Sequence, residues 1–144
     1  MKSDLPKITR NPAETQELGN RFSENLSAGD VVFIIGELGA GKTVFVKGIA
    51  AGLGIRENIT SPSFNLVKTY QGRCTLNHYD FYRLNPGDDL SELNVEALQD
   101  DDSICVIEWG ERFAILHTTP RWEVRIKYSD SDIERLIEIE RIAG

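Results

Sequence analysis

Residues 31–43 read VVFIIGELGAGKT, and this stretch decides the fold. It opens with five consecutive apolar residues, which is typical of a strand covered on both faces in the middle of a parallel sheet. A glycine-rich loop, residues 36–43, follows directly, and residues 43–53 then carry apolar side chains at helical spacing. Because strand, loop and helix are contiguous, the sequence predicts an α/β protein.

The loop fits the Walker A pattern, Gly-x4-Gly-Lys-Thr. Its glycines let backbone N–H groups turn toward phosphate oxygens, and the following helix adds its positive dipole end. We expect Lys42 to reach the terminal phosphates and the Thr43 hydroxyl to bind Mg²⁺. A glycine-rich turn that binds nothing is the alternative, and the flanking strand and helix disfavour it.

The remaining segments predict the other elements of one domain spanning residues 1–144. Asn11-Pro12 begins a helix that we expect to run to about residue 27, because a capping side chain precedes a proline. Strands are predicted over residues 64–70, 73–80, 104–107, 122–128 and 133–142, and short helices over residues 90–98 and 110–116. The first two of these strands and the last two are expected to form hairpins. The predicted fold is a P-loop NTPase-like three-layer sandwich with a mixed, mainly parallel central sheet and antiparallel hairpin additions.

Composition limits the classes of function. The 16 Lys and Arg against 23 Asp and Glu give a net charge of −7, so we expect little direct binding of nucleic acid by the chain alone. No apolar stretch has the length of a membrane span, which predicts a cytoplasmic protein. Cys74 and Cys105 are far apart and are expected to be buried, reduced thiols. His78 and His117 have no metal-ligand spacing, and each is expected to be partly buried or exposed.

A P-loop enzyme also needs an acid at the tip of a neighbouring strand to hold magnesium or its waters. Glu108 follows four apolar residues and is the stronger candidate, with an exposed strand-end acid as the alternative. Asp80 ends a more polar stretch and is equally compatible with a turn-capping role. Trp109 is predicted either to line the site or to pack. Residues 60–63 carry three hydroxyls around a proline, which fits a nucleotide switch or an ordinary turn.

Four motifs in this order, GELGAGKT, SPSF, HYDFYRL and EWGER, resemble the bacterial TsaE (YjeE) family over nearly the whole chain. That family is the ATPase subunit of the machinery that makes threonylcarbamoyladenosine next to the anticodon of certain tRNAs. The resemblance implies ATP and Mg²⁺ as cofactors, TsaD and TsaB as partner proteins, and slow ATP hydrolysis by the chain alone. The absence of an Asn-Lys-x-Asp motif after the loop independently favours ATP over GTP.

Site residues are also implied by the resemblance, position by position. It places the ATP phosphates on Glu37, Leu38, Gly39, Ala40, Gly41, Lys42 and Thr43. It implies Mg²⁺ on Thr43 and Glu108, with Asp80 as a Walker-B-like acid, so that Lys42, Asp80 and Glu108 are the expected catalytic residues. It also implies that residues 60–63 are switch-like, that Trp109 lies near the active site, and that Thr15 and Arg135 approach the nucleotide. Ser63 stands where the family usually has Thr.

Three functions fit these residues. The first is an ATPase whose hydrolysis resets a partner complex. The second is a small-molecule P-loop kinase, for which Arg83 and Arg112 are the only plausible lid arginines and no acceptor domain is evident. The third is a nucleotide-gated binding module without useful turnover.

Overall fold

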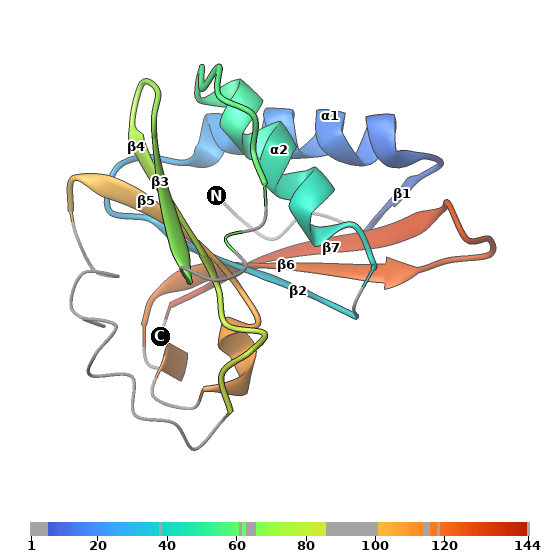
Figure 1. Ribbon diagram of the computed structural model, residues 1–144. Helices are drawn as coiled ribbons and strands as arrows, with labels where there is room; N and C mark the ends of the chain where they lie inside the picture. Colours follow the sequence, from blue (N-terminus) through green and yellow to red (C-terminus); the bar gives the residue numbers. More distant parts are fainter. Residues whose placement is uncertain are drawn as a thin grey trace.

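A seven-stranded sheet runs through the molecule in the order β1-β7-β6-β2-β5-β4-β3 (Figure 1). The computed structural model describes residues 6–37, 39–60, 62, 66–85, 101–113, 116–117 and 119–143. The strands are β1 (Lys7–Thr9), β2 (Val31–Gly36), β3 (Val67–Gln71), β4 (Thr75–Asp80), β5 (Ser103–Glu108), β6 (Arg121–Tyr128) and β7 (Arg135–Ile142).

The middle of the sheet is parallel. Strand β2 pairs in parallel with both β5 and β6, and β4 pairs in parallel with β5. The hairpins β3–β4 and β6–β7 are antiparallel, so the predicted mixed sheet and both predicted hairpins are confirmed. As expected of a central strand, Val31, Val32, Phe33 and Ile34 of β2 are all buried.

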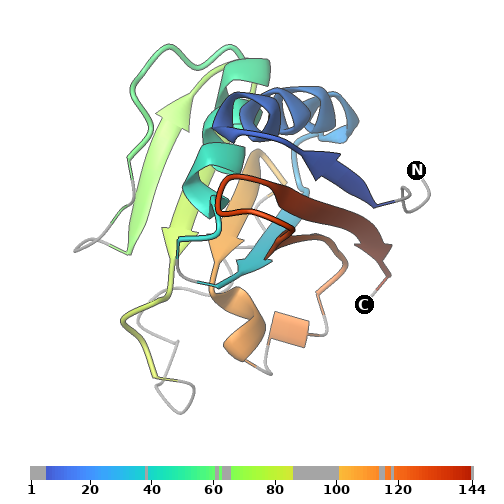
Figure 2. The ribbon, with the colours of Figure 1, turned by 90° about the vertical axis from the view of Figure 1, so that its right-hand side faces the viewer.

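Two helices, α1 (Pro12–Phe22) and α2 (Lys42–Gly52), cover one face of this sheet (Figure 2). Their backbones pack directly against each other at two glycines. A Cβ atom at Gly19 would meet the carbonyl oxygen of Phe45, and one at Gly48 would meet the carbonyl oxygen of Gln16. This close packing fixes α2 against α1. The N-terminus of α2 follows directly after the loop that leaves the end of β2.

Helix α1 is shorter than predicted. It begins as expected, since Asn11 Oδ1 accepts a hydrogen bond from the Glu14 N–H at 2.9 Å. It ends at Phe22 rather than near residue 27 and continues as one 3-10 turn, η1 (Ser23–Asn25). The hydroxyl of Ser23 donates to the carbonyl of Asn20 and the amide of Asn25 donates to that of Phe22, so side chains compete with the helical hydrogen bonds here.

Two apolar clusters lie on the two faces of the sheet, the first beneath the helices. The second apolar cluster covers the opposite face and includes Phe33, Phe81, Phe113 and Leu116. The segment predicted as a helix over residues 110–116 forms the 3-10 turn η4 (Gly110–Arg112) at its start. The helix predicted over residues 90–98 lies outside the described residues. Strand β1 was not predicted, because it has only three residues and leaves Ile8 exposed.

The two cysteines are free thiols, and Cys105 is buried as predicted. The prediction was wrong for Cys74, which is only partly buried because it lies at the turn between β3 and β4. Within the part of the chain that the structure describes, no helix is long and apolar enough to cross a membrane.

Candidate nucleotide-binding site

The glycine-rich loop connects β2 to α2 in a conformation that requires glycine. Gly39 and Gly41 have φ angles of +80° and +102°, in the left-handed region. Gly41 is also the N-cap of α2 and provides no side-chain acceptor for the first N–H groups of the helix. The helix N-terminus is therefore suited to an anion such as a phosphate. Leu38, predicted to contact phosphate, lies outside the described residues.

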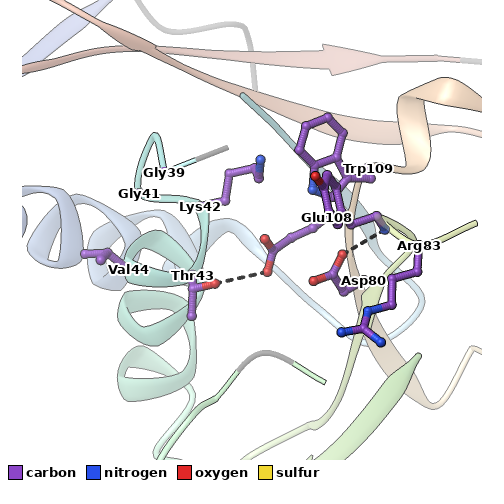
Figure 3. A pocket seen from close by; sticks show the side chains of 10 residues that line it. Gly39, Gly41, Lys42, Thr43, Val44, Asp80, Arg83, Glu108 and Trp109 are labelled. Atoms are coloured by element: carbon purple, nitrogen blue, oxygen red, sulfur yellow. Dashed lines mark hydrogen bonds between the residues drawn. The ribbon is translucent and has the colours of Figure 1, made fainter. Parts of the chain in front are cut away.

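A pocket of about 430 Å³ lies beside this loop (Figure 3). The structure brings most of the predicted site residues together in its lining, which consists of Gly39, Gly41, Lys42, Thr43, Val44, Asp80, Tyr82, Arg83, Glu108 and Trp109. Asp80 and Glu108 end the neighbouring parallel strands β4 and β5 and are register partners. The pocket thus lies at the carboxyl edge of the parallel strands, where α/β proteins bind their ligands.

The Lys42 ammonium lies against backbone carbonyl groups at the start of the loop. Its Nζ donates to the carbonyl oxygens of Gly36 at 2.6 Å and Glu37 at 3.2 Å, and it lies 3.8 Å from the centroid of the Trp109 ring. Burial lowers the pKa of Lys42, although the charges of Glu108, Glu111 and Asp80 oppose this shift. A bound phosphate would add negative charge and stabilise the ammonium.

Glu108 is buried, which excludes the exposed strand-end acid considered as its alternative. The Thr43 hydroxyl donates to Glu108 Oε2 at 3.4 Å (Figure 3). This contact brings together the two residues that were expected to hold magnesium, one from α2 and one from β5.

His78 was expected to be partly buried or exposed, and this prediction was wrong. The side chain is fully buried, and its Nε2 lies 2.6 Å from Glu108 Oε2. Because side chains alternate along a strand, His78 shares a face of β4 with Asp80, two residues further on. That spacing was the signal in the sequence that could have placed His78 beside the site.

Asp80 lies at the pocket and also caps a turn, as its alternative predicted, while its role as a Walker-B-like acid stays a prediction. It lines the pocket, and its Oδ1 accepts a hydrogen bond from the Tyr82 N–H at 3.0 Å, which caps the turn after β4. Trp109 lines the pocket and also packs against the second apolar cluster. Its ring centroid lies 5.2 Å from that of the exposed Tyr82. Trp109 has a φ angle of +67°, which turns the chain away directly after Glu108.

Glu111 was missed by sequence reasoning. Burial raises the pKa of its carboxyl group, and among the described residues its buried Oε1 has no hydrogen-bond partner. Its burial depends on the 3-10 turn that follows Trp109, which no sequence pattern specified. His117, by contrast, is exposed as expected, and its Nε2 lies 2.7 Å from the Glu111 carbonyl oxygen.

Thr15 and Arg135 lie beside the loop but not in the pocket with Glu108. Together with Ala40, Gly41 and Val44 they help to line a separate, smaller pocket of about 30 Å³. Arg135 Nε donates to the Ala40 carbonyl at 2.7 Å, and the Thr15 hydroxyl is 2.7 Å from that of Thr9. Both therefore lie next to the loop, and their approach to the nucleotide, which the resemblance implies, stays a prediction.

Of the two arginines considered for a kinase lid, Arg83 lines the pocket. Arg112 instead donates from Nη2 to the carbonyl oxygens of Phe81 at 2.8 Å and Leu84 at 2.5 Å. These bonds hold the segment after β4 in place, so Arg112 has a structural role in this arrangement.

The oxygen donors at the pocket fit Mg²⁺. Thr43, Asp80 and Glu108 offer a hydroxyl and two carboxylates, which are hard ligands. No group of three or more His, Cys, Asp or Glu residues able to hold a metal occurs in the described ranges. Mg²⁺ needs no such cage, because it usually keeps several waters and takes phosphate oxygens as further ligands.

A glycine-rich loop between a central parallel strand and a helix, with acids at the tips of the adjacent strands, defines the class of P-loop proteins. Within that class, the family model described as "Threonylcarbamoyl adenosine biosynthesis protein TsaE" matches residues 9–137. The chain belongs to the TsaE family, which takes part in the biosynthesis of threonylcarbamoyladenosine in tRNA.

Individual relatives agree with this assignment. The chain is 46% identical over 107 residues to the tRNA threonylcarbamoyladenosine biosynthesis protein TsaE of Treponema pallidum, covering 74% of this chain and 79% of the relative. It is 43% identical over 142 residues to the protein of that name from Mycobacterium tuberculosis, covering 90% and 82%. The crystal structure of Bacillus subtilis YdiB matches with a TM-score of 0.73 at 32% identity, covering 100% of this chain and 89% of that one.

Proposed function

We propose that this chain binds ATP with Mg²⁺ and hydrolyses it, and that hydrolysis acts on the TsaB–TsaD partner proteins during threonylcarbamoyladenosine synthesis. The observation that carries the proposal is the contact between Thr43 Oγ1 and Glu108 Oε2, at 3.4 Å, beside the glycine-rich loop. The Thr43 hydroxyl comes from the start of α2 and the Glu108 carboxylate from the end of β5. They meet where the terminal phosphates of a nucleotide would lie.

Each residue at the loop has a role in this proposal. Backbone N–H groups of the loop and the Lys42 ammonium bind the phosphates. Thr43 and Glu108 would hold Mg²⁺, which would supply positive charge to neutralise the phosphates. Asp80 lies at the tip of the adjacent strand and is the acid we assign to orienting the attacking water. The rate of hydrolysis then depends mainly on how these residues position the phosphates and the attacking water.

The partner proteins are inferred from the family. The net charge of −7 supports a chain that leaves tRNA contacts to its partners and meets a basic surface on them. A kinase is disfavoured because Arg112, one of its two lid candidates, is bonded to backbone carbonyls.

ATP hydrolysis measured with and without the TsaB–TsaD pair tests the proposal. We expect stimulation by the pair, phosphate release without any phosphorylated acceptor, and a loss of about a hundredfold in rate for Glu108→Ala. The absence of stimulation would contradict the partnership. Partner control that responds to ATP but persists unchanged in Glu108→Ala would favour a binding module without turnover.

A further inference from the structure

We propose that His78 is a positioning residue for the nucleotide site, which donates its Nε2–H to Glu108 Oε2 and holds that carboxylate at the loop. This inference rests on the proposed function, in which Glu108 is a ligand of magnesium. It assigns a role to a buried histidine that the phosphate loop and the two acids leave unexplained.

The sheet places the two side chains together. His78 of β4 is the register partner of Val106, and Asp80 is the register partner of Glu108, so His78 lies diagonally across from Glu108 on the neighbouring strand. His78 is 0% and Glu108 3% exposed. The contact between their side chains is therefore shielded from water, where a hydrogen bond is electrostatically stronger than at the surface.

The proton in this contact belongs on the histidine. The distance of 2.6 Å between Nε2 and Oε2 requires a hydrogen between them, and an ionised carboxylate can only accept. The other ring nitrogen, Nδ1, is buried and has no hydrogen-bond partner among the described residues. A hydrogen on Nδ1 would be a buried donor without an acceptor, so the tautomer with hydrogen on Nε2 fits the surroundings.

This bond, rather than the one to Thr43, fixes the carboxylate. The Thr43 hydroxyl is 3.4 Å from Oε2, longer than an ordinary O–H···O hydrogen bond, whereas the His78 contact is short. Both contacts use Oε2 and neither uses Oε1. His78 thus orients Glu108 before a ligand arrives, in the way that outer groups commonly orient metal-binding carboxylates.

A matched pair of variants separates positioning from simple filling of space. In His78→Gln the amide Nε2 stands as many bonds from the backbone as the histidine Nε2 and can donate to Glu108. His78→Met has a similar length and no donor. We expect Mg²⁺ to enhance the binding of a fluorescent ATP analogue. The measurements are the Mg²⁺ concentration that gives half of this enhancement and the melting temperature of each variant.

For His78→Met we expect this Mg²⁺ concentration to rise about tenfold or more, and we expect His78→Gln to recover most of the loss at a similar melting temperature. Equal Mg²⁺ responses in the two variants, or a parental response in His78→Met, would overturn the inference while leaving the proposed function intact. A parent chain that binds the analogue without any effect of Mg²⁺ would overturn the proposed function and this inference with it.

A second measurement does not depend on either variant folding or on nucleotide. The ¹⁵N chemical shifts of the His78 ring in the nucleotide-free chain report which nitrogen carries hydrogen. We expect a proton-bearing Nε2 and a bare Nδ1, whereas a ring with its only hydrogen on Nδ1 would overturn the proposal.

Discussion

The Lys42 ammonium lies 3.8 Å from the centroid of the Trp109 ring, so the lysine of the phosphate loop rests on the residue that directly follows the buried acid Glu108. Its other contacts are the carbonyl oxygens of Gly36 and Glu37. Within the described residues it forms no ion pair closer than 4 Å to a carboxylate. The direct contacts of the Lys42 ammonium are thus backbone carbonyl dipoles and an aromatic face, and a bound phosphate can replace them.

Nucleotide binding should therefore be visible in the fluorescence of Trp109. We expect ATP to draw Lys42 away from the ring and to change the tryptophan emission. The chain has two tryptophans, and Trp122 is buried against Phe22, away from the loop. Trp109→Phe should abolish the change and Trp122→Phe should retain it in an ATP titration. A response that persists in Trp109→Phe would contradict the assignment.

The affinity for ATP should begin to fall at a lower pH than it would if Lys42 had the ordinary pKa of a lysine. Burial lowers the pKa of Lys42 in the free protein, and phosphates favour the charged ammonium, so binding raises that pKa and takes up a proton. Affinity then decreases by up to about tenfold per pH unit between the free and bound pKa values. Calorimetry in two buffers of different ionisation enthalpy measures this uptake.

The control for this pH dependence is Lys47→Ala, which removes an exposed lysine from the same helix. We expect the pH profile of Lys47→Ala to match that of the parent chain. If the parent chain took up no proton and its affinity for ATP stayed constant up to the ordinary pKa range of lysine, the role of Lys42 would be contradicted.

Arg135 should support nucleotide binding by holding the loop. Its Nε donates to the Ala40 carbonyl at 2.7 Å, and a hydrogen bond from a charged group contributes about 1.5–3 kcal/mol. Arg135→Ala should weaken ATP binding about tenfold, which corresponds to about 1.4 kcal/mol. Arg141→Ala removes an exposed arginine from the same strand and should leave the affinity unchanged. Equal effects of the two substitutions in equilibrium titrations would argue against a specific contact.

Local patterns were sufficient to predict the elements that carry the loop. The apolar run of β2, the glycine pattern and the spacing of α2 are each contained within a few consecutive residues, and the two hairpins are likewise local. Strand β1 escaped prediction because three residues carry no periodicity and are defined by pairing with the distant strand β7. The end of α1 was misplaced because side-chain hydrogen bonds from Ser23 and Asn25 override helical spacing.

The sequence predicted which residues form the candidate site more completely than it predicted which residues there are buried. Lys42, Thr43, Asp80 and Glu108 were identified from their positions at the loop and at strand ends. The burial of His78 was not foreseen, because it depends on tertiary packing rather than on a local pattern. Glu111 was missed for a similar reason, since its environment is created by the turn after Trp109.

Glu111 should lower the stability of the fold at neutral pH. Burial raises the pKa of its carboxyl group, so the folded chain holds the proton more tightly than the unfolded chain. Below the unfolded pKa the group is neutral in both states and has no effect. As the pH rises through the folded pKa, ionisation is opposed by burial, and the free energy of unfolding decreases.

Glu111→Gln removes this ionisation and tests the sign. We expect the variant to be about as stable as the parent at about pH 4 and more stable at about pH 7.5, measured by urea unfolding at both pH values. Glu57→Gln makes the same change of charge at an exposed position and should have little effect at either pH. If Glu111→Gln were less stable than the parent at the higher pH, the ionised carboxylate of Glu111 would have to make a favourable contact. The inference that partial burial opposes its ionisation would then be wrong.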